Sequence, residues 1–234
     1  MNKVAKIAIG CLIALFLGGV AAVVGFGGLL WWGKGKIREI TGPVTESVQK
    51  IEALEKKANA NPFTRPPDGV IAEDRLLKFL EVRKSVFEVY DKHRAELEAV
   101  SQKRQADFSD LTKGIAGLGE IRTTQAQALA DVGMSTAEYA FMVESVYKSA
   151  WAAAVAQAHG GKSVSEATGE ALGQVQKQLE GVSTLEAARA LKDLQTAAGQ
   201  SKALDVPKAN IELFRKYEEE IKKYAMAGLE LVGL

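Results

Sequence analysis

The segment from Ile7 to Gly33 constrains this chain most, because no charged residue interrupts its run of Ile, Leu, Val, Phe, Ala and Gly. As an α-helix rising about 1.5 Å per residue it would be roughly 40 Å long, whereas the hydrocarbon core of a bilayer is about 30 Å thick. The sequence therefore predicts one transmembrane helix over residues 7–33 in contact with the lipid bilayer. Everything after this helix is tethered to the membrane.

Basic residues lie on both sides of the apolar run, so their distribution alone does not fix its orientation. A cleavable signal peptide has an apolar region of about 7 to 15 residues, whereas this run continues to Trp32. An uncleaved run behind a short basic segment, here with Lys3 and Lys6, is the layout of a signal anchor. We therefore expect a single-pass protein of a bacterial inner membrane, with residues 1–6 in the cytoplasm and the C-terminal domain in the periplasm.

Small residues recur at four-residue intervals within the predicted anchor, at Gly10, Ala14, Gly18 and Ala22. On a helix this spacing forms one stripe, along which a second transmembrane helix can approach closely. The stripe favours a homo-oligomer formed through the anchor. Apolar helices are rich in Gly and Ala in any case, so a merely glycine-rich anchor is the alternative interpretation.

The composition beyond the anchor fits a single soluble domain, because the 234 residues less the anchor leave about 200, within the usual domain size. Lys and Arg number 30 and Asp and Glu number 29, so the chain has no bulk charge to attract nucleic acid, and we expect none as a partner. The single cysteine, Cys11, lies in the apolar run, which excludes an intramolecular disulfide.

Two segments connect the anchor to this domain. Residues 34–58 carry an apolar stripe at helical spacing with Glu and Lys around it, which predicts a short helical stalk. Residues 59–70 contain three of the chain's five prolines, so they form a linker that cannot be helical throughout and marks a domain boundary. Phe63 is the large apolar residue of the linker. We expect it to pin the linker onto the helical domain; an exposed, proline-flanked docking site is the alternative.

Residues 71–234 repeat their apolar positions at three- and four-residue steps, and no segment alternates with the period of two that strands show. Ser135, Ser163 and Ser183 each stand three residues before a Glu, which is the capping box of a helix start. The sequence therefore predicts an all-α bundle of about six helices, over 71–104, 107–131, 135–160, 163–181, 183–199 and 207–234. Gly117 and its neighbouring glycines in the second helix predict close packing or a kink.

One stretch resembles a known group of proteins. Phe63 to Gly69 and Leu76 to Arg83 resemble the Phe-x-Pro-Pro-x-Asp-Gly linker and the Leu-x-x-Phe-Leu-x-Val-Arg helix of uncharacterised bacterial signal-anchored envelope proteins. The chain departs from that pattern at Arg65, where the first proline of the pair would stand. The resemblance implies a layout of anchor, linker and helical domain, and it implies no activity.

Three charged side chains fall on apolar helix faces when each helix is stepped at 100° per residue: Arg83, Arg122 and Glu218. Because a buried ion is costly alone, we expect these three to converge, with Arg94 and Glu144 at the margins. The cluster would be either a structural ion network or a site in which surplus arginine binds an anionic ligand.

Catalytic and metal motifs are sparse, since the two histidines, His93 and His159, have no metal-ligand spacing to each other or to nearby acids. The sequence predicts no cofactor, no metal and no catalytic residue, and it leans against an enzyme without excluding one. It favours a membrane-anchored scaffold or adaptor of the cell envelope that recruits another envelope protein. The alternative is a helical module that binds a small anionic or amphipathic ligand.

Overall fold

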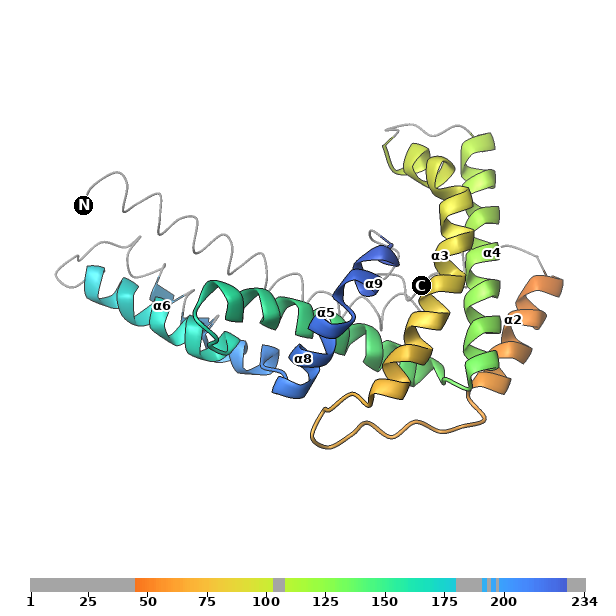
Figure 1. Cartoon of the computed structure of the whole chain (residues 1–234). Helices are drawn as coiled ribbons and strands as arrows, with labels where there is room; N and C mark the ends of the chain where they lie inside the picture. Colours follow the sequence, from red (N-terminus) through yellow and green to blue (C-terminus); the bar gives the residue numbers. More distant parts are fainter. Residues whose placement is uncertain (1–44, 103–107, 180–190, 193–194, 197, 227–234) are drawn as a thin grey trace. The chain divides into compact units, whose positions relative to one another are not determined.

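The computed structural model describes residues 45–102, 108–179, 191–192, 195–196 and 198–226. Within these ranges every regular element is helical, and the described part contains no strand, in agreement with the predicted all-α class. The elements are α2 (Thr45–Ala58), α3 (Glu73–Gln102), α4 (Phe108–Val132), α5 (Thr136–Ala158), α6 (Val164–Leu179), the 3-10 turn η1 (Lys202–Leu204), α8 (Lys208–Lys216) and α9 (Glu218–Lys223) (Figure 1).

The described part of the chain has no helix long and apolar enough to cross a membrane. The segment predicted to do so, residues 7–33, lies outside the described residues, as do the stripe of Gly10, Ala14, Gly18 and Ala22 and the capping box at Ser183.

The described residues fall into two compact units. One holds residues 45–144 and 216–226, and the other holds the described residues between 145 and 215. Helix α5 contributes to both, because the division falls between Glu144 and Ser145. The sequence placed one bundle over 71–234; in the structure the first unit also takes in α2 and the linker, and the described residues between 145 and 215 form a unit of their own.

In the first unit, α2 and α3 both pack against α4 (Figure 1). Helix α3 is long because its buried positions recur at helical spacing, so that one face lies against its neighbours. The buried apolar side chains of this unit include Leu76, Phe79, Leu80, Val86, Ile121, Leu129, Met134 and Met142.

The predicted stalk over 34–58 needs correction where it is described. Helix α2 packs on α4, its last residue Ala58 is fully buried, and Glu55 accepts a 2.7 Å hydrogen bond from Arg122. The apolar stripe that predicted a stalk thus belongs to a bundle helix. None of residues 59–70 belongs to a helix, and both flanks of this linker belong to the same unit.

The second unit has a small core, made of Ala152, Val155, Val164, Ala167 and Leu204. Its polar contacts secure the start of α6: Ser163 and Glu166 form the predicted capping box, and the carboxylate of Asp205 accepts from both the backbone and the hydroxyl of Ser165. The Ser163 hydrogen bonds lower the pKa of Glu166.

The last helix predicted from Pro207 onward is broken. Helices α8 and α9 are separated by Tyr217, whose φ of −114° and ψ of 17° lie outside the helical range. Because the hydroxyl of Tyr217 and the amine of Lys216 both contact Glu73 on α3, the break occurs where the chain reaches the first unit's long helix.

Candidate functional site

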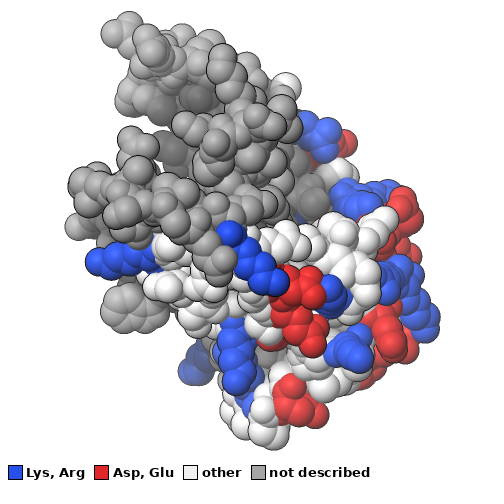
Figure 2. Space-filling model, turned by 90° about the vertical axis from the view of Figure 1, so that its left-hand side faces the viewer, with Lys and Arg blue, Asp and Glu red and all other residues white. Residues whose placement is uncertain are grey.

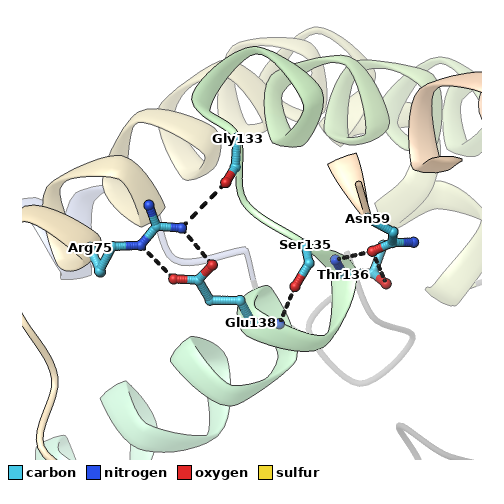
Figure 3. A network of polar contacts seen from close by, with 6 residues as sticks. All are labelled: Asn59, Arg75, Gly133, Ser135, Thr136 and Glu138. Carbon is cyan, nitrogen blue, oxygen red and sulfur yellow. Dashed lines mark hydrogen bonds and ion pairs between the residues drawn. The ribbon is translucent and has the colours of Figure 1, made fainter. Parts of the chain in front are cut away.

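The turn between α4 and α5 carries a network of polar contacts that joins four segments (Figure 3). Helix α4 ends at Gly133, whose φ of +65° suits glycine, and the next amide, of Met134, donates to the carbonyl of Leu129 at 2.9 Å. Ser135 then starts α5, because its hydroxyl accepts the amide hydrogen of Glu138 at 3.1 Å. The sequence predicted both the glycine stop and this serine cap.

Arg75 of α3 joins this turn through Glu138. Its Nε and Nη2 groups donate to the two carboxylate oxygens at 2.5 Å each, and Nη2 also donates to the carbonyl of Gly133 at 3.4 Å. The side chain of Glu138 is only 10% exposed. These hydrogen bonds raise the pKa of Arg75 above its usual value, while partial burial acts in the opposite direction. The pair therefore fixes the start of α3 against the start of α5.

Asn59, just beyond α2, also belongs to the network through hydrogen bonds to the start of α5. Its Oδ1 atom accepts from the amide of Thr136 at 2.9 Å and from the Thr136 hydroxyl at 3.1 Å, so it caps α5 from 77 residues away. Sequence reasoning missed Asn59 and Arg75. The capping box indicated where α5 begins, but nothing local to either residue indicates a partner so distant in the sequence.

The linker is held down next to the same helix. The ring of Phe63 lies 5.3 Å from that of Phe141 between centroids, and the guanidinium of Arg65 lies 5.0 Å from the Phe141 ring centre. Arg65 also donates to Glu144 at 3.0 Å. Phe63 thus packs on the helical domain, as the first of the two interpretations of the linker expected.

Arg83 lies in the middle of α3 and is 4% exposed. Its Nη1 group donates to the hydroxyl of Tyr139 at 3.3 Å, and Nη2 donates to the main-chain carbonyl of Tyr224 at 2.9 Å. The helical pattern assigned Arg83 to a buried face, and the structure places it there. Through these two hydrogen bonds the guanidinium connects α3, α5 and the C-terminal segment.

The sequence predicted that Arg83, Arg122 and Glu218 converge; in the structure Arg122 and Glu218 make contacts with other residues. Arg122 donates to Glu55 at 2.7 Å and to Gln125 at 2.8 Å, and Glu218 pairs with Lys222 one turn along α9. Helical stepping identifies the face on which a residue lies, but not which helix covers that face. At the margins, Arg94 pairs with Asp91 and lies over the rings of Phe87 and Tyr90, and Glu144 pairs with Arg65.

A further polar cluster joins Glu73 of α3 to the break between α8 and α9. One carboxylate oxygen of Glu73 accepts from the amine of Lys216 at 2.6 Å and from the hydroxyl of Tyr217 at 2.5 Å. These two hydrogen bonds, that of Lys216 first, lower the pKa of Glu73, and they raise the pKa values of Lys216 and Tyr217.

His93, on α3, lies close to Gly117 and Glu120 of α4. Its Nε2 atom is 2.9 Å from a carboxylate oxygen of Glu120, and a side chain at Gly117 would come within 3.1 Å of the imidazole. Among the described residues, no group of three or more His, Cys, Asp or Glu side chains is placed to hold a metal ion.

Comparison of the chain with protein-family models, with curated proteins and with solved structures finds no match. The chemistry of the site is therefore argued from its own groups. Arg75, Arg83 and Arg122 offer planar guanidinium donors to carboxylate, phenol and carbonyl oxygens. Such contacts orient segments of chain, and they are also the contacts by which a protein recognises another peptide.

Proposed function

We propose that this chain is a non-catalytic, membrane-anchored scaffold or adaptor of the bacterial cell envelope, whose helical domain recruits another envelope protein. The observation that carries the proposal is the network at the α4–α5 turn (Figure 3), in which Asn59, Arg75 and Glu138 link the end of α2, the start of α3 and the start of α5. A recruiting surface needs fixed helix positions, and this network supplies them.

The proposed anchor would keep the domain close to the bilayer. The apolar run ends at Gly33, and α2 begins at Thr45. A fully extended chain spans about 3.5 Å per residue, so the 12 residues between these positions (45 − 33) allow at most about 40 Å. A partner recruited by this domain would therefore be held near the membrane surface.

The charge distribution favours a protein partner over a polyanion. Figure 2 shows Lys and Arg interspersed with Asp and Glu over the described part of the face that it displays, in keeping with 30 basic and 29 acidic residues in the chain. Charges of mixed sign select a partner by local complementarity, whereas a polyanion needs a field of one sign.

A helical module for a small anionic or amphipathic ligand is the second candidate, and the burial of the Arg83 guanidinium favours it. Two acceptors of Arg83 are neutral oxygens of the chain itself, Tyr139 Oη and Tyr224 O. This chemistry suits a peptide carbonyl at least as well as a free anion, which is why we place the scaffold first.

Two experiments test the scaffold. A reporter active only outside the cytoplasm, fused after Leu234, should be active, and an inactive but well-expressed fusion would overturn the periplasmic location. Crosslinking in native membranes, followed by purification of the chain, should recover one other envelope protein in near-stoichiometric amount. Recovery of a tightly bound small anion, with no crosslinked protein, would favour the ligand-binding module instead.

A further inference from the structure

His93 and Glu120 join α3 to α4 through a contact that includes a titratable ring. Nε2 of His93 lies 2.9 Å from a carboxylate oxygen of Glu120. The two side chains are 24% and 54% exposed, so the ring is largely covered while the carboxylate remains open to water. Histidine is the side chain whose ordinary pKa places its change of charge between about pH 5 and pH 8. The contact is therefore an ion pair when the imidazole is protonated and a hydrogen bond without that attraction when it is neutral.

Gly117 fixes the position of the imidazole ring. A Cβ atom at Gly117 would lie 3.1 Å from Cγ of His93 and 3.3 Å from its Cβ and Nδ1 atoms, so the ring packs directly on the backbone of α4. Gly117 and Glu120 are three residues apart and share one face of that helix. The glycine thus holds one edge of the ring while Nε2 meets the carboxylate, and little side-chain freedom is left to lose when the ion pair forms.

The charges around the pair leave Glu120 to favour the protonated ring. The other charged or titratable residues within four positions of either member are Tyr90, Asp91, Lys92, Arg94 and Glu96 on α3 and Arg122 on α4. Asp91 offsets Arg94, with which it pairs at 2.9 Å, and Arg122 donates to Glu55 of α2. Lys92 is exposed, and its charge acts against protonation of the neighbouring ring. Glu96 stands one turn further along α3 and serves below as a control.

The part of α4 that carries this contact is weak as a helix. Its sequence places glycines at 114, 117 and 119, all in the first half of the helix. Glycine loses more conformational freedom in a helix than any other residue, so each of them destabilises this part of α4 relative to alanine. Segments of low local stability are the first to open in a folded protein. A contact that holds this segment against α3 therefore has a measurable effect on its opening.

We propose that the contact of His93 with Glu120 is a pH-sensitive switch, which holds the adjoining parts of α3 and α4 together when the imidazole is protonated and loosens them when it is neutral. Loss of the proton removes the Coulomb attraction between the ring and the carboxylate. The stabilisation is thus present below the ordinary histidine pKa of about 6.5 and is lost as the pH rises through the value of the folded chain. The switch goes beyond the proposed scaffold function and does not depend on it.

Titration of His93 by NMR, in the full-length chain in detergent micelles, is the first test. His159→Gln removes the chain's other histidine, so labelled imidazole nitrogens report His93 alone. Adding Glu120→Gln to this chain should lower the titration midpoint by about 0.5 pH unit, which is about a threefold loss of proton affinity. Glu96→Gln is the control and should lower it by less than half as much. An unchanged midpoint in Glu120→Gln, or an equal fall in Glu96→Gln, would overturn the proposal.

The loosening of the helices is measured with two spin labels. Ala95 of α3 and Leu118 of α4 are both exposed, so cysteines there accept labels in a chain that also carries Cys11→Ser. Raising the pH from about 5.5 to about 8.5 should increase the fraction of molecules with a longer distance between the labels at least about twofold. An identical distance distribution at both pH values would overturn the switch.

The matched variant is His93→Gln, which has no titratable ring. Its distance distribution should contain the longer separation at both pH values, and a change with pH as large as that of the wild-type background would also overturn the proposal. Circular dichroism at both pH values checks that each chain is folded. If His93→Gln is unfolded, Glu120→Gln takes its place, because this carboxylate is 54% exposed and its replacement leaves the core intact. It should likewise remove the dependence on pH.

Discussion

Arg75 and Glu138 meet in a two-bond fork, in which Nε and Nη2 of the arginine each donate to a separate carboxylate oxygen at 2.5 Å. A planar guanidinium matches a carboxylate in this way only when both the distance and the relative rotation of the groups are correct. The contact therefore fixes how the first turn of α3 faces the first turn of α5. It also supports Gly133, whose carbonyl receives a third hydrogen bond from Arg75.

We predict that Arg75→Met and Glu138→Met each lower the free energy of unfolding by about 1 to 3 kcal/mol, because the first leaves the buried Glu138 and the second the partly buried Arg75 without its charged partner. The double variant should recover part of this loss. Urea unfolding followed by circular dichroism measures the effect. The matched control is the exposed pair of Lys57 and Asp131, 3.7 Å apart, where the same substitutions should change stability by less than about 0.5 kcal/mol. If the double variant instead loses the sum of the two single losses in free energy of unfolding, Arg75 and Glu138 do not stabilise each other.

Asn59 gives a second prediction. Asn59→Ala removes the oxygen that caps α5 at Thr136, and loss of a helix cap costs about 1 kcal/mol. Asn61→Ala, two residues along the same linker, removes an exposed side chain and should change stability by less than about 0.5 kcal/mol. Thermal unfolding of the two variants side by side would separate a cap from a general effect of the linker. Equal melting temperatures would mean that Thr136 does not depend on Asn59.

Local signals were sufficient for most helix ends. The serine of a capping box and the glycine that comes after a helix act within a few residues, and α3 to α6 begin and end within about three residues of the predicted positions. Gly133, Gly160 and Gly161 all have positive φ, as the predicted helix stops require.

Contacts between helices could not be predicted in the same way. The stripe of α2 was interpreted correctly as helical, but periodicity does not say whether such a stripe faces solvent, a coiled-coil partner or a bundle. For the same reason the sequence did not point to the contact between Arg122 and Glu55, which lies on the helix taken for a stalk. The break occurs at Tyr217, whose hydroxyl contacts Glu73, 144 residues away, and no local signal marks it.

The close approach of α3 and α4 at His93 gives a third prediction. Gly119 has open space around it, so Gly119→Ala should stabilise the chain by about 0.5 to 1 kcal/mol through helix propensity alone. At Gly117 a methyl group would lie 3.1 Å from His93 Cγ, and overpacking of this kind costs about 1 to 3 kcal/mol. The Gly117→Ala chain should therefore be less stable than the Gly119→Ala chain by at least about 1 kcal/mol in urea unfolding. Equal stabilisation by both would indicate that the helices separate easily at this point.

The last prediction concerns pH and the attachment of the C-terminal segment at Glu73. Lys216 and Tyr217 lower the pKa of Glu73, so the folded chain holds a proton there less tightly than the unfolded chain. The stabilisation is therefore fully present above the usual carboxyl pKa of about 4.3 and is lost as the pH falls through the lower folded value. The pKa values of Lys216 and Tyr217 are raised. Their contribution is present below their usual values of about 10 and is lost as the pH rises through the raised ones.

The contacts of Glu73 with Lys216 and Tyr217 should consequently stabilise the folded chain most between about pH 5 and pH 9, and less on either side of that range. Glu73→Gln removes the carboxylate, so the difference in free energy of unfolding between wild type and this variant should be largest within that window and should shrink as the pH falls below about 4. Glu88→Gln is the matched control, because Glu88 is an exposed carboxylate on the same helix. Carboxyl NMR of Glu73 should give a titration midpoint below that of a model glutamate. A midpoint at or above the model value would show that Lys216 and Tyr217 do not hold Glu73 in solution.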